Sequence, residues 1–233
     1  MSTVTTGAGG SAGVSGAKAE ILARVRGAVR DLTAPLGARG PSPRVEFAAP
    51  ERHTTIELFV ENVVDYKATV VRVGAGEVGD AVAQALSGVE SVLVPAGLEA
   101  TWTAGLPATM RRVRDDELSN ADLDEVAAVV TASAVSIATT GTIVLDHGPD
   151  QGRRALSLVP DLHVCVVRAE QVVHDVPEAV ARLRPQVGSA QPQTWISGPS
   201  ATSDIELDRV EGVHGPRTLH VILVEEGVAA AAR

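Results

Sequence analysis

Three observations predict an α/β fold with a mainly parallel sheet. Short apolar segments rich in Val and Ile alternate along the chain with segments of helical periodicity. Those apolar segments are continuous and do not alternate with polar residues, as expected for strands buried on both faces. The chain has 233 residues, enough for one such domain, and only 2% of them are aromatic, so Val, Ile, Leu and Ala must form most of the core.

The N-terminal part of the chain is expected to lie outside this domain. Residues 1–17 are uncharged and rich in Gly, Ser, Ala and Thr, which predicts a disordered tail. Apolar residues then recur at spacings of three and four over residues 18–31, and several Pro and Gly residues follow. Residues 18–53 are therefore predicted to form a helical arm and a linker, residues 54–226 the α/β domain, and residues 227–233 a short tail.

The elements of the domain follow from its periodicity and its capping residues. Thr54 or Thr55 is expected to cap the first helix, and Asn120 or Asp122 a later helix that runs to residue 132. Two further helices are predicted over residues 76–86 and 177–183. Strands are predicted over residues 68–73, 91–94, 110–113, 135–138, 142–145, 163–168, 194–197 and 219–225. The two strands that flank Thr140 and Gly141 suggest a local hairpin or a bulge.

Charge and cysteine content exclude several classes of function. With 20 basic and 29 acidic residues, the net charge of −9 argues against binding to nucleic acid or to anionic membranes. No signal peptide is evident, and the uncharged residues 126–145 contain too many Thr and Ser residues for a membrane span, so a cytoplasmic protein is expected. The single cysteine, Cys165, cannot form an internal disulfide or hold an iron–sulfur cluster by itself, and is predicted to be a buried packing residue.

The segment after the predicted strand 194–197 is the first candidate site. Gly198, Pro199, Ser200 and Thr202 form a turn that opens a short helix, and free amides and hydroxyls at such a place can bind an anion. Asp204 and Glu206 would oppose a nearby anion and would suit a hydroxyl, an amine or a metal better. The alternative is a capping box, in which Ser203 and Glu206 only stabilise the helix end.

Two further candidates follow other strands. Thr140, Gly141 and Thr142 offer hydroxyl donors and a close backbone approach, although Thr and Gly are also ordinary turn residues. Arg153 and Arg154 lie on a Gly-rich loop and can bind carboxylate or phosphate, or simply face solvent. Turns that follow parallel strands share one edge of a sheet, so we expect a small-anion site at the carboxyl edge, with one of these arginines at its rim.

Neither a metal nor a cofactor is predicted. The histidines at positions 147, 163, 214 and 220 could form a metal site, but none has the spacing of a known ligand motif, and His163 and His220 begin apolar strands as core or edge histidines do. Gly74, Gly76 and Gly79 match the spacing of a dinucleotide-binding loop, but such spacing recurs by chance in a Gly-rich chain.

Three segments in order resemble the LUD domain, and within that family the C proteins of lactate utilisation. They are Thr140-Gly141-Thr142-Ile143-Val144-Leu145, Gly152-Arg153-Arg154-Ala155-Leu156-Ser157-Leu158-Val159-Pro160, and Gly198-Pro199-Ser200 to Asp204-Ile205-Glu206, followed by Val213-His214-Gly215-Pro216. The resemblance covers about residues 18–226. Family members often have an acidic residue before the Thr-Gly-Thr segment, where this chain has Thr139.

The resemblance implies a three-layer α/β/α fold like that of the NagB/RpiA/CoA-transferase group. It also implies a non-cluster subunit or accessory protein in bacterial oxidation of L-lactate to pyruvate, beside partner subunits that carry iron–sulfur clusters. It supplies no catalytic residues, so whether the chain is an enzyme stays open. The alternative is a free-standing enzyme or a sensor for a phosphorylated, CoA-linked or small carboxylate ligand.

Overall fold

The computed structural model describes residues 12–28, 50–115, 118–183, 192–202, 210–211 and 215–225. The chain divides into two compact units, Met1–Ala48 and Ala49–Arg233. In the first unit, α1 spans Ala12–Ala28, and its Ile21, Leu22 and Val25 are exposed. The helix begins before residue 18, so residues 12–17, which were expected in the tail, are helical.

The second unit is built on a six-stranded sheet in which every pair of neighbouring strands is parallel. Its order is β1-β12-β7-β4-β2-β3. The strands are β1 (Thr69–Val73), β2 (Ser91–Leu93), β3 (Arg111–Val113), β4 (Ala128–Ala132), β7 (Leu162–Arg168) and β12 (Thr218–Val224). The predicted α/β class with a mainly parallel sheet is therefore confirmed.

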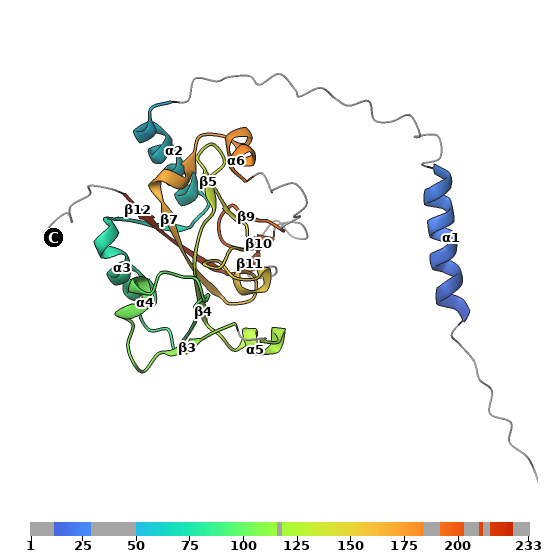
Figure 1. Ribbon diagram of the computed structural model, residues 1–233, viewed down its shortest axis with the longest axis horizontal. Coiled ribbons are helices and arrows are strands. Elements are labelled where there is room, and N and C mark those ends of the chain that lie inside the picture. The colour runs from blue at the N-terminus through green and yellow to red at the C-terminus, as the bar shows by residue number, and fades with distance from the viewer. Residues whose placement is uncertain are drawn as a thin grey trace, which may run out of the picture. The chain divides into compact units, whose positions relative to one another are not determined.

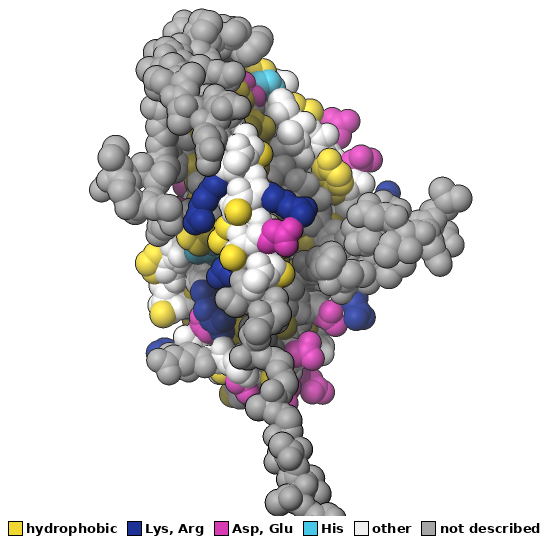
Figure 2. All heavy atoms as spheres, turned by 90° about the vertical axis from the view of Figure 1, so that its right-hand side faces the viewer, with side chains coloured by type: hydrophobic (Ala, Val, Ile, Leu, Met, Phe, Trp, Pro, Cys, Tyr) yellow, Lys and Arg dark blue, Asp and Glu magenta, His cyan; other side chains and the backbone are white. Residues whose placement is uncertain are grey.

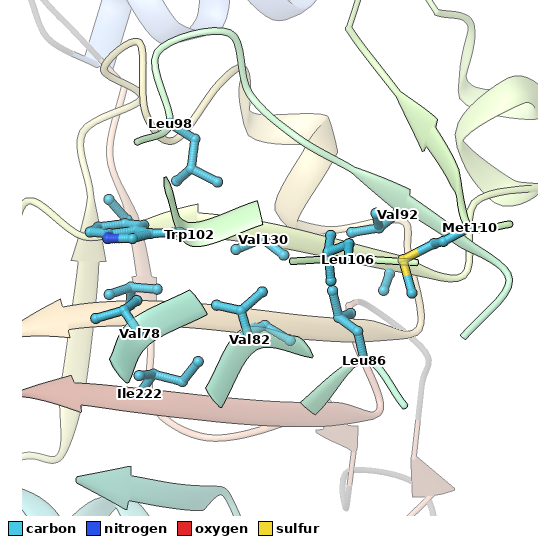
Figure 3. Close-up of a cluster of buried hydrophobic side chains, with 14 of the residues drawn as sticks. Val78, Val82, Leu86, Val92, Leu98, Trp102, Leu106, Met110, Val130 and Ile222 are labelled. Carbon is cyan, nitrogen blue, oxygen red and sulfur yellow. The ribbon is translucent and has the colours of Figure 1, made fainter. Parts of the chain in front are cut away.

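One face of this sheet is covered by α3 (Val78–Ala85) and α4 (Thr101–Ala104), with η2 (Ala75–Glu77) preceding α3. Val78, Val82 and Leu86 are spaced four apart and point from α3 toward the strands (Figure 3). Trp102 packs into the same cluster and is only 4% exposed. A single aromatic residue thus fills space in a cluster that otherwise consists of aliphatic side chains and Met110.

The other face packs against a second sheet of four strands and against α2 (Arg52–Asp65). The strand order of this second sheet is β8-β5-β6-β9, and β6 is antiparallel to both β5 and β9. The strands are β5 (Val135–Ile137), β6 (Thr142–Leu145), β8 (Val172–Val173) and β9 (Thr194–Ile196). The hairpin predicted at Thr140 and Gly141 is thus the β5–β6 connection.

Short elements complete the layers. α6 (Val176–Arg182) packs on the side of the second sheet that faces away from the first sheet, while α3 and α4 lie on the opposite side of the unit (Figure 1). α5 (Asn120–Asp124) and η3 (Arg154–Ser157) cover β2 and β4. The remaining elements are η4 (Ala169–Gln171) and the paired strands β10 (Ala201–Thr202) and β11 (Val210–Glu211).

Two predicted helix boundaries are wrong. The helix expected to reach residue 132 ends at Asp124, because the next apolar run forms β4, a strand buried between β2 and β7. That helix is capped by Ser119, whose hydroxyl accepts from the Asp122 amide at 3.2 Å. α2 begins at Arg52, so Thr55 is a buried residue within the helix and not its cap.

Residues 126–145, which carry no charge, belong to β4, β5 and β6 and the turns between them. Within the described ranges, none of the helices has the length and apolar character that crossing a membrane requires.

Candidate functional site

The two turns that the sequence analysis singled out lie side by side. β6 is antiparallel to β9 with Ile143 opposite Ile196, so Thr142 at the start of β6 lies beside Ser197 at the end of β9. Their hydroxyl oxygens are 2.8 Å apart. The adjacency was predicted, but the reason given for it was wrong, because the shared edge belongs to the mixed four-stranded sheet and not to the parallel sheet.

The carboxyl end of α2 supports both turns. Gly141 has a φ of +54°, and the side-chain amide of Asn62 donates to the Ala138 carbonyl at 2.8 Å. Gly198 has a φ of +89°, and a Cβ at this position would lie 2.7 Å from Cβ of Tyr66. Glycine is needed at both positions because the backbone is left-handed and the helix leaves no room for a side chain.

We expect Gly198→Ala to lower the free energy of unfolding by about 2 kcal/mol, since left-handed strain and overlap with Tyr66 add together. Gly88→Ala is the matched control. Gly88 has a φ of +80° but nothing within 4 Å of the added Cβ, so only the strain of about 1 kcal/mol applies. Urea unfolding of both variants measures the difference, and equal losses would contradict close packing of Gly198 on α2.

Three hydroxyl groups form a chain where the turns meet. Oγ1 of Thr140 lies 2.8 Å from Oγ1 of Thr142, which lies 2.8 Å from Oγ of Ser197. Thr142 is buried, whereas Thr140 and Ser197 are exposed. The Thr142 hydroxyl donates to the Thr140 carbonyl at 3.2 Å, so its oxygen can accept from the hydroxyls of Thr140 and Ser197.

Thr142→Val should cost about 1 kcal/mol of unfolding free energy, because it removes this buried hydrogen-bonding group without changing the side-chain shape. Binding of a small carboxylate should also weaken severalfold. Thr139→Val is the control, since the exposed Thr139 makes no side-chain hydrogen bond within the described part of the chain. Denaturation and ligand titration provide the two measurements, and equal behaviour of both variants would argue against a role for the hydroxyl chain.

A pocket of about 160 Å³ adjoins this contact. Hydroxyl and imidazole groups alternate with apolar side chains in its wall. The lining consists of Ser157, Leu158, His163, Thr194, Trp195, Ile196, Ser197, Gly198, Pro199, Ser200, Gly215, Pro216 and Leu219. His163 and Leu219 are the second residues of β7 and β12, so the pocket lies at the amino end of the parallel strands, whereas the sequence analysis expected a site at their carboxyl edge.

His163 is the titratable residue of this lining. It is 1% exposed, and its Nε2 lies 2.8 Å from Oγ1 of Thr131 on β4. Burial lowers the pKa of His163 to about 4, so the imidazole is neutral near pH 7. Burial also raises the pKa of the neighbouring Cys165 thiol to about 12.

A second histidine, His147, does not line the pocket but contacts Thr194, which does. His147 has a left-handed φ of +60°, and its Nδ1 lies 3.0 Å from the Gly152 carbonyl, which can only accept. Nδ1 therefore donates, and Nε2 lies 2.9 Å from the hydroxyl oxygen of Thr194. This pair fixes the rotamer of Thr194, whose side chain lines the pocket.

The two predicted arginines have different surroundings. Nε of Arg153 lies 2.9 Å from both carboxylate oxygens of Asp115, and this arginine also donates to the Leu118 carbonyl, so it joins η3 to the segment after β3. Arg154 is exposed and makes no hydrogen bond through its guanidinium within the described residues. Neither arginine lines the pocket.

The other predicted residues are partly outside the described residues. Gly198, Pro199 and Ser200 line the pocket, and the Ser200 amide donates to the Pro216 carbonyl at 2.8 Å. Asp204 and Glu206 lie outside the described residues, as do Ser203 and His214, and so does the side chain of Thr202. In the Gly74 loop, the carboxylate of Glu77 accepts from the Gly74 amide at 2.9 Å and so occupies a donor that a phosphate would need.

Sequence reasoning missed His163 and Thr194 as site residues. His163 was interpreted as a core or edge histidine, which agrees with its burial but not with its place in a pocket wall. The available signal was a polar side chain at the second position of an otherwise apolar strand start. Within the described ranges no group of three His, Cys, Asp or Glu residues could hold a metal ion.

Side chains of both charge signs lie on the described residues that face the viewer in Figure 2, so the net charge of −9 does not imply a uniformly acidic surface.

Comparisons with known proteins agree with one another. The LUD domain family model matches residues 56–224. Lactate utilization protein C of Deinococcus radiodurans is 47% identical over 211 residues, which cover 89% of this chain and 95% of that protein. Lactate utilization protein C of Bacillus subtilis is 36% identical over 101 residues, 42% of each chain. A crystal structure of a DUF162 family protein from Deinococcus radiodurans is 45% identical, covers 75% of this chain and 98% of that chain, and has a TM-score of 0.65.

Proposed function

Because this chain belongs to the LUD domain family, we propose that it is the C component of a bacterial lactate-utilisation system. In this role it is a subunit or accessory protein of the oxidation of L-lactate to pyruvate. The observation that carries the proposal is the 47% identity to a lactate utilization protein C, which extends over 95% of that protein.

The cysteine content supports a subunit that holds no cluster of its own. The chain contains one cysteine, and Cys165 is buried in a strand with a pKa raised to about 12. A buried, protonated thiol is a poor cluster ligand, and a cluster normally needs four ligands. The electrons of lactate oxidation would therefore be taken up by partner subunits that carry iron–sulfur clusters.

The pocket has the size of a small carboxylic acid. A cavity of roughly 150 Å³ accommodates benzene, which has six non-hydrogen atoms. The pocket has a similar volume, about 160 Å³, and lactate and pyruvate each have six non-hydrogen atoms as well. Leu158, Ile196 and Leu219 would contact the methyl group, and polar groups of the pocket lining the carboxylate. A few hydrogen bonds of roughly 1 kcal/mol each predict affinity near millimolar.

The alternatives retained from the sequence are less well supported by this geometry. A CoA-linked ligand is far larger than the pocket, and a phosphate would find no Lys or Arg among the described lining residues. A sensor for a small carboxylate would fit the same pocket. Turnover of L-lactate by the assembled system, and its loss when this subunit is omitted, would distinguish a working component from a sensor.

The deciding experiment is deletion of the gene followed by growth on L-lactate as sole carbon source. We expect growth to fail on L-lactate and to persist on pyruvate, and to return when the full chain is supplied on a plasmid. Co-purification of the tagged chain with iron-containing proteins tests the partner assignment separately. Normal growth of the deletion strain on L-lactate, in a host without a second lactate-oxidising system, would overturn the proposal.

A further inference from the structure

One side of β1 lies at the edge of the six-stranded sheet. β1 pairs with β12 along its other side, and no further described strand pairs with it. The carbonyl of Val73 accepts from the Glu225 amide and therefore points toward β12. Because successive residues of a strand point their backbone groups in opposite directions, Val71 also faces β12, whereas Val70 and Arg72 face away from it. The N–H and C=O groups of Val70 and Arg72 accordingly have no hydrogen-bond partner within the described part of the chain.

β1 is the longest of the described strands that lie at the edge of a multi-stranded sheet. It has five residues, whereas β3 and β9 have three each and β8 has two. β3, at the opposite edge of the same sheet, carries Arg111 and Arg112, whose guanidinium groups donate to backbone carbonyls and form no ion pair with a described carboxylate. Such charges discourage another strand from pairing at an edge.

The charge on β1 is compensated within the chain. Nε and Nη2 of Arg72 lie 2.6 and 2.9 Å from the two carboxylate oxygens of Glu225. Nη1 of the same guanidinium lies 2.6 Å from Oε1 of Glu57 on α2. Two copies of this edge can therefore approach each other without bringing two uncompensated arginine charges together, so the protection that β3 has is absent from β1.

Exposed apolar side chains concentrate in β1 and at the end of α2. The described residues of the second unit expose five large apolar side chains, and three of them are Val64, Tyr66 and Val71. Val71 is 41% exposed at the centre of β1. Val64 lies in the last turn of α2, which packs against β1, and Tyr66 follows that helix. Apolar groups gathered on a surface in this way are typical of a protein–protein contact.

From these observations we propose that β1 is a dimerisation edge, at which β1 of a second copy of this chain pairs in the antiparallel direction. Val71 is the central residue of β1, so a two-fold axis beside it overlaps the two strands along their whole length. Val70 then lies opposite Arg72 of the second copy, and each such pair exchanges two N–H···O bonds. The dimer joins two six-stranded sheets into one continuous sheet.

The position of the outward-facing groups favours a second copy as the partner. Val70 and Arg72 stand symmetrically on either side of Val71, so the same edge satisfies itself when it is turned by the two-fold axis. The two copies of Val71 form the intervening pair, in which side chains approach most closely. A contact between strands of five residues is small for a permanent dimer, so we expect a dissociation constant of roughly 1–100 μM.

The test is analytical ultracentrifugation of the full-length chain from about 1 to 200 μM, where the average mass should rise toward that of a dimer. Val71→Lys places two ammonium groups in the closest pair and should weaken the dimer about tenfold. Val70→Pro should weaken it about as much, because it removes an N–H that faces away from β12 and leaves the pairing with β12 intact. Val180→Lys is the matched control, since Val180 is 50% exposed on α6, and it should not change the dissociation constant.

Cysteine cross-linking provides a second measurement that does not depend on weakening the contact. The Cα atoms of the central pair would lie about 4.5 Å apart, which a disulfide can span. Mild oxidation should therefore convert Val71→Cys to a covalent dimer severalfold faster than Val180→Cys, and the buried Cys165 does not compete. A chain that stays monomeric over this concentration range, a dimer that Val71→Lys leaves intact, or equal cross-linking of the two cysteine variants would overturn the proposal.

Discussion

Replacing Phe59 by Ala is expected to lower the free energy of unfolding by about 3–5 kcal/mol, the cost of emptying a fully buried aromatic site. Phe59 is 0% exposed and fills the space between α2, the first sheet and the second sheet. In a unit of this size each kcal/mol lowers the melting temperature by roughly 2–4 °C, so the midpoint should fall by about 10 °C. Differential scanning calorimetry provides the measurement.

Val64→Ala is the matched control for this prediction. Val64 lies in the same helix but is 50% exposed, so its truncation should change the free energy of unfolding by less than about 0.5 kcal/mol. Because α2 also supports Gly141 and Gly198, Phe59→Ala should weaken ligand binding as well as stability. A small change in stability for Phe59→Ala would mean that α2 is not part of the cooperative core.

Acid should destabilise the folded chain through His163. The pKa of this imidazole falls from an ordinary 6.5 to about 4 on folding, because burial disfavours the charged form. Between these values the unfolded chain takes up a proton that the folded chain does not, so the free energy of unfolding decreases as the pH falls from 6.5 to 4. A pKa difference of one is worth about 1.4 kcal/mol, which gives a loss of about 3 kcal/mol at pH 4.

His163→Gln isolates this effect because glutamine does not titrate. Urea unfolding at several pH values should show a steeper loss for the wild type than for the variant, with the difference confined to pH 6.5–4. Partial burial also lowers the pKa of His220, but that contribution is present in both proteins and cancels. Parallel curves for the two proteins would show that His163 does not stay neutral in the folded chain.

Local pattern was sufficient to predict many elements of the fold and one feature of the site. Val- and Ile-rich runs identified strands such as β7 and β12, since their side chains are buried on both faces. The pair of strands around Gly141 was predicted because two apolar segments flank a Thr-Gly turn, and the structure shows Gly141 with a left-handed φ of +54°. The turn at Thr140–Thr142 and the turn that begins at Gly198 were expected to lie together, but the contact between Thr142 and Ser197 was not predicted.

Features that depend on which strands become neighbours were not predictable from local pattern. The run after Asp124 was expected to continue the helix to residue 132, but burial between β2 and β7 makes this run a strand. In the sequence His163 resembles any core histidine. Its place in a pocket wall depends on β9, whose residues line the same pocket. Arg153 was expected at the rim of the site, yet Asp115, which is distant in sequence, holds its guanidinium elsewhere.

The pairing of β1 with β12 has a consequence for how the chain is made. Among the described strands β1 is the first to leave the ribosome and β12 the last, yet Thr69 pairs with His220 and the register continues to Val73 and Val224. Until β12 is synthesised, β1 therefore lacks its only neighbour in the sheet, and β7 has one unpaired edge. Such distant pairing slows folding and leaves apolar strands exposed to aggregation. A stop codon shortly before Thr218 would consequently remove β12 and leave β1 without a partner, so a late truncation would also cost the sheet one of its earliest strands.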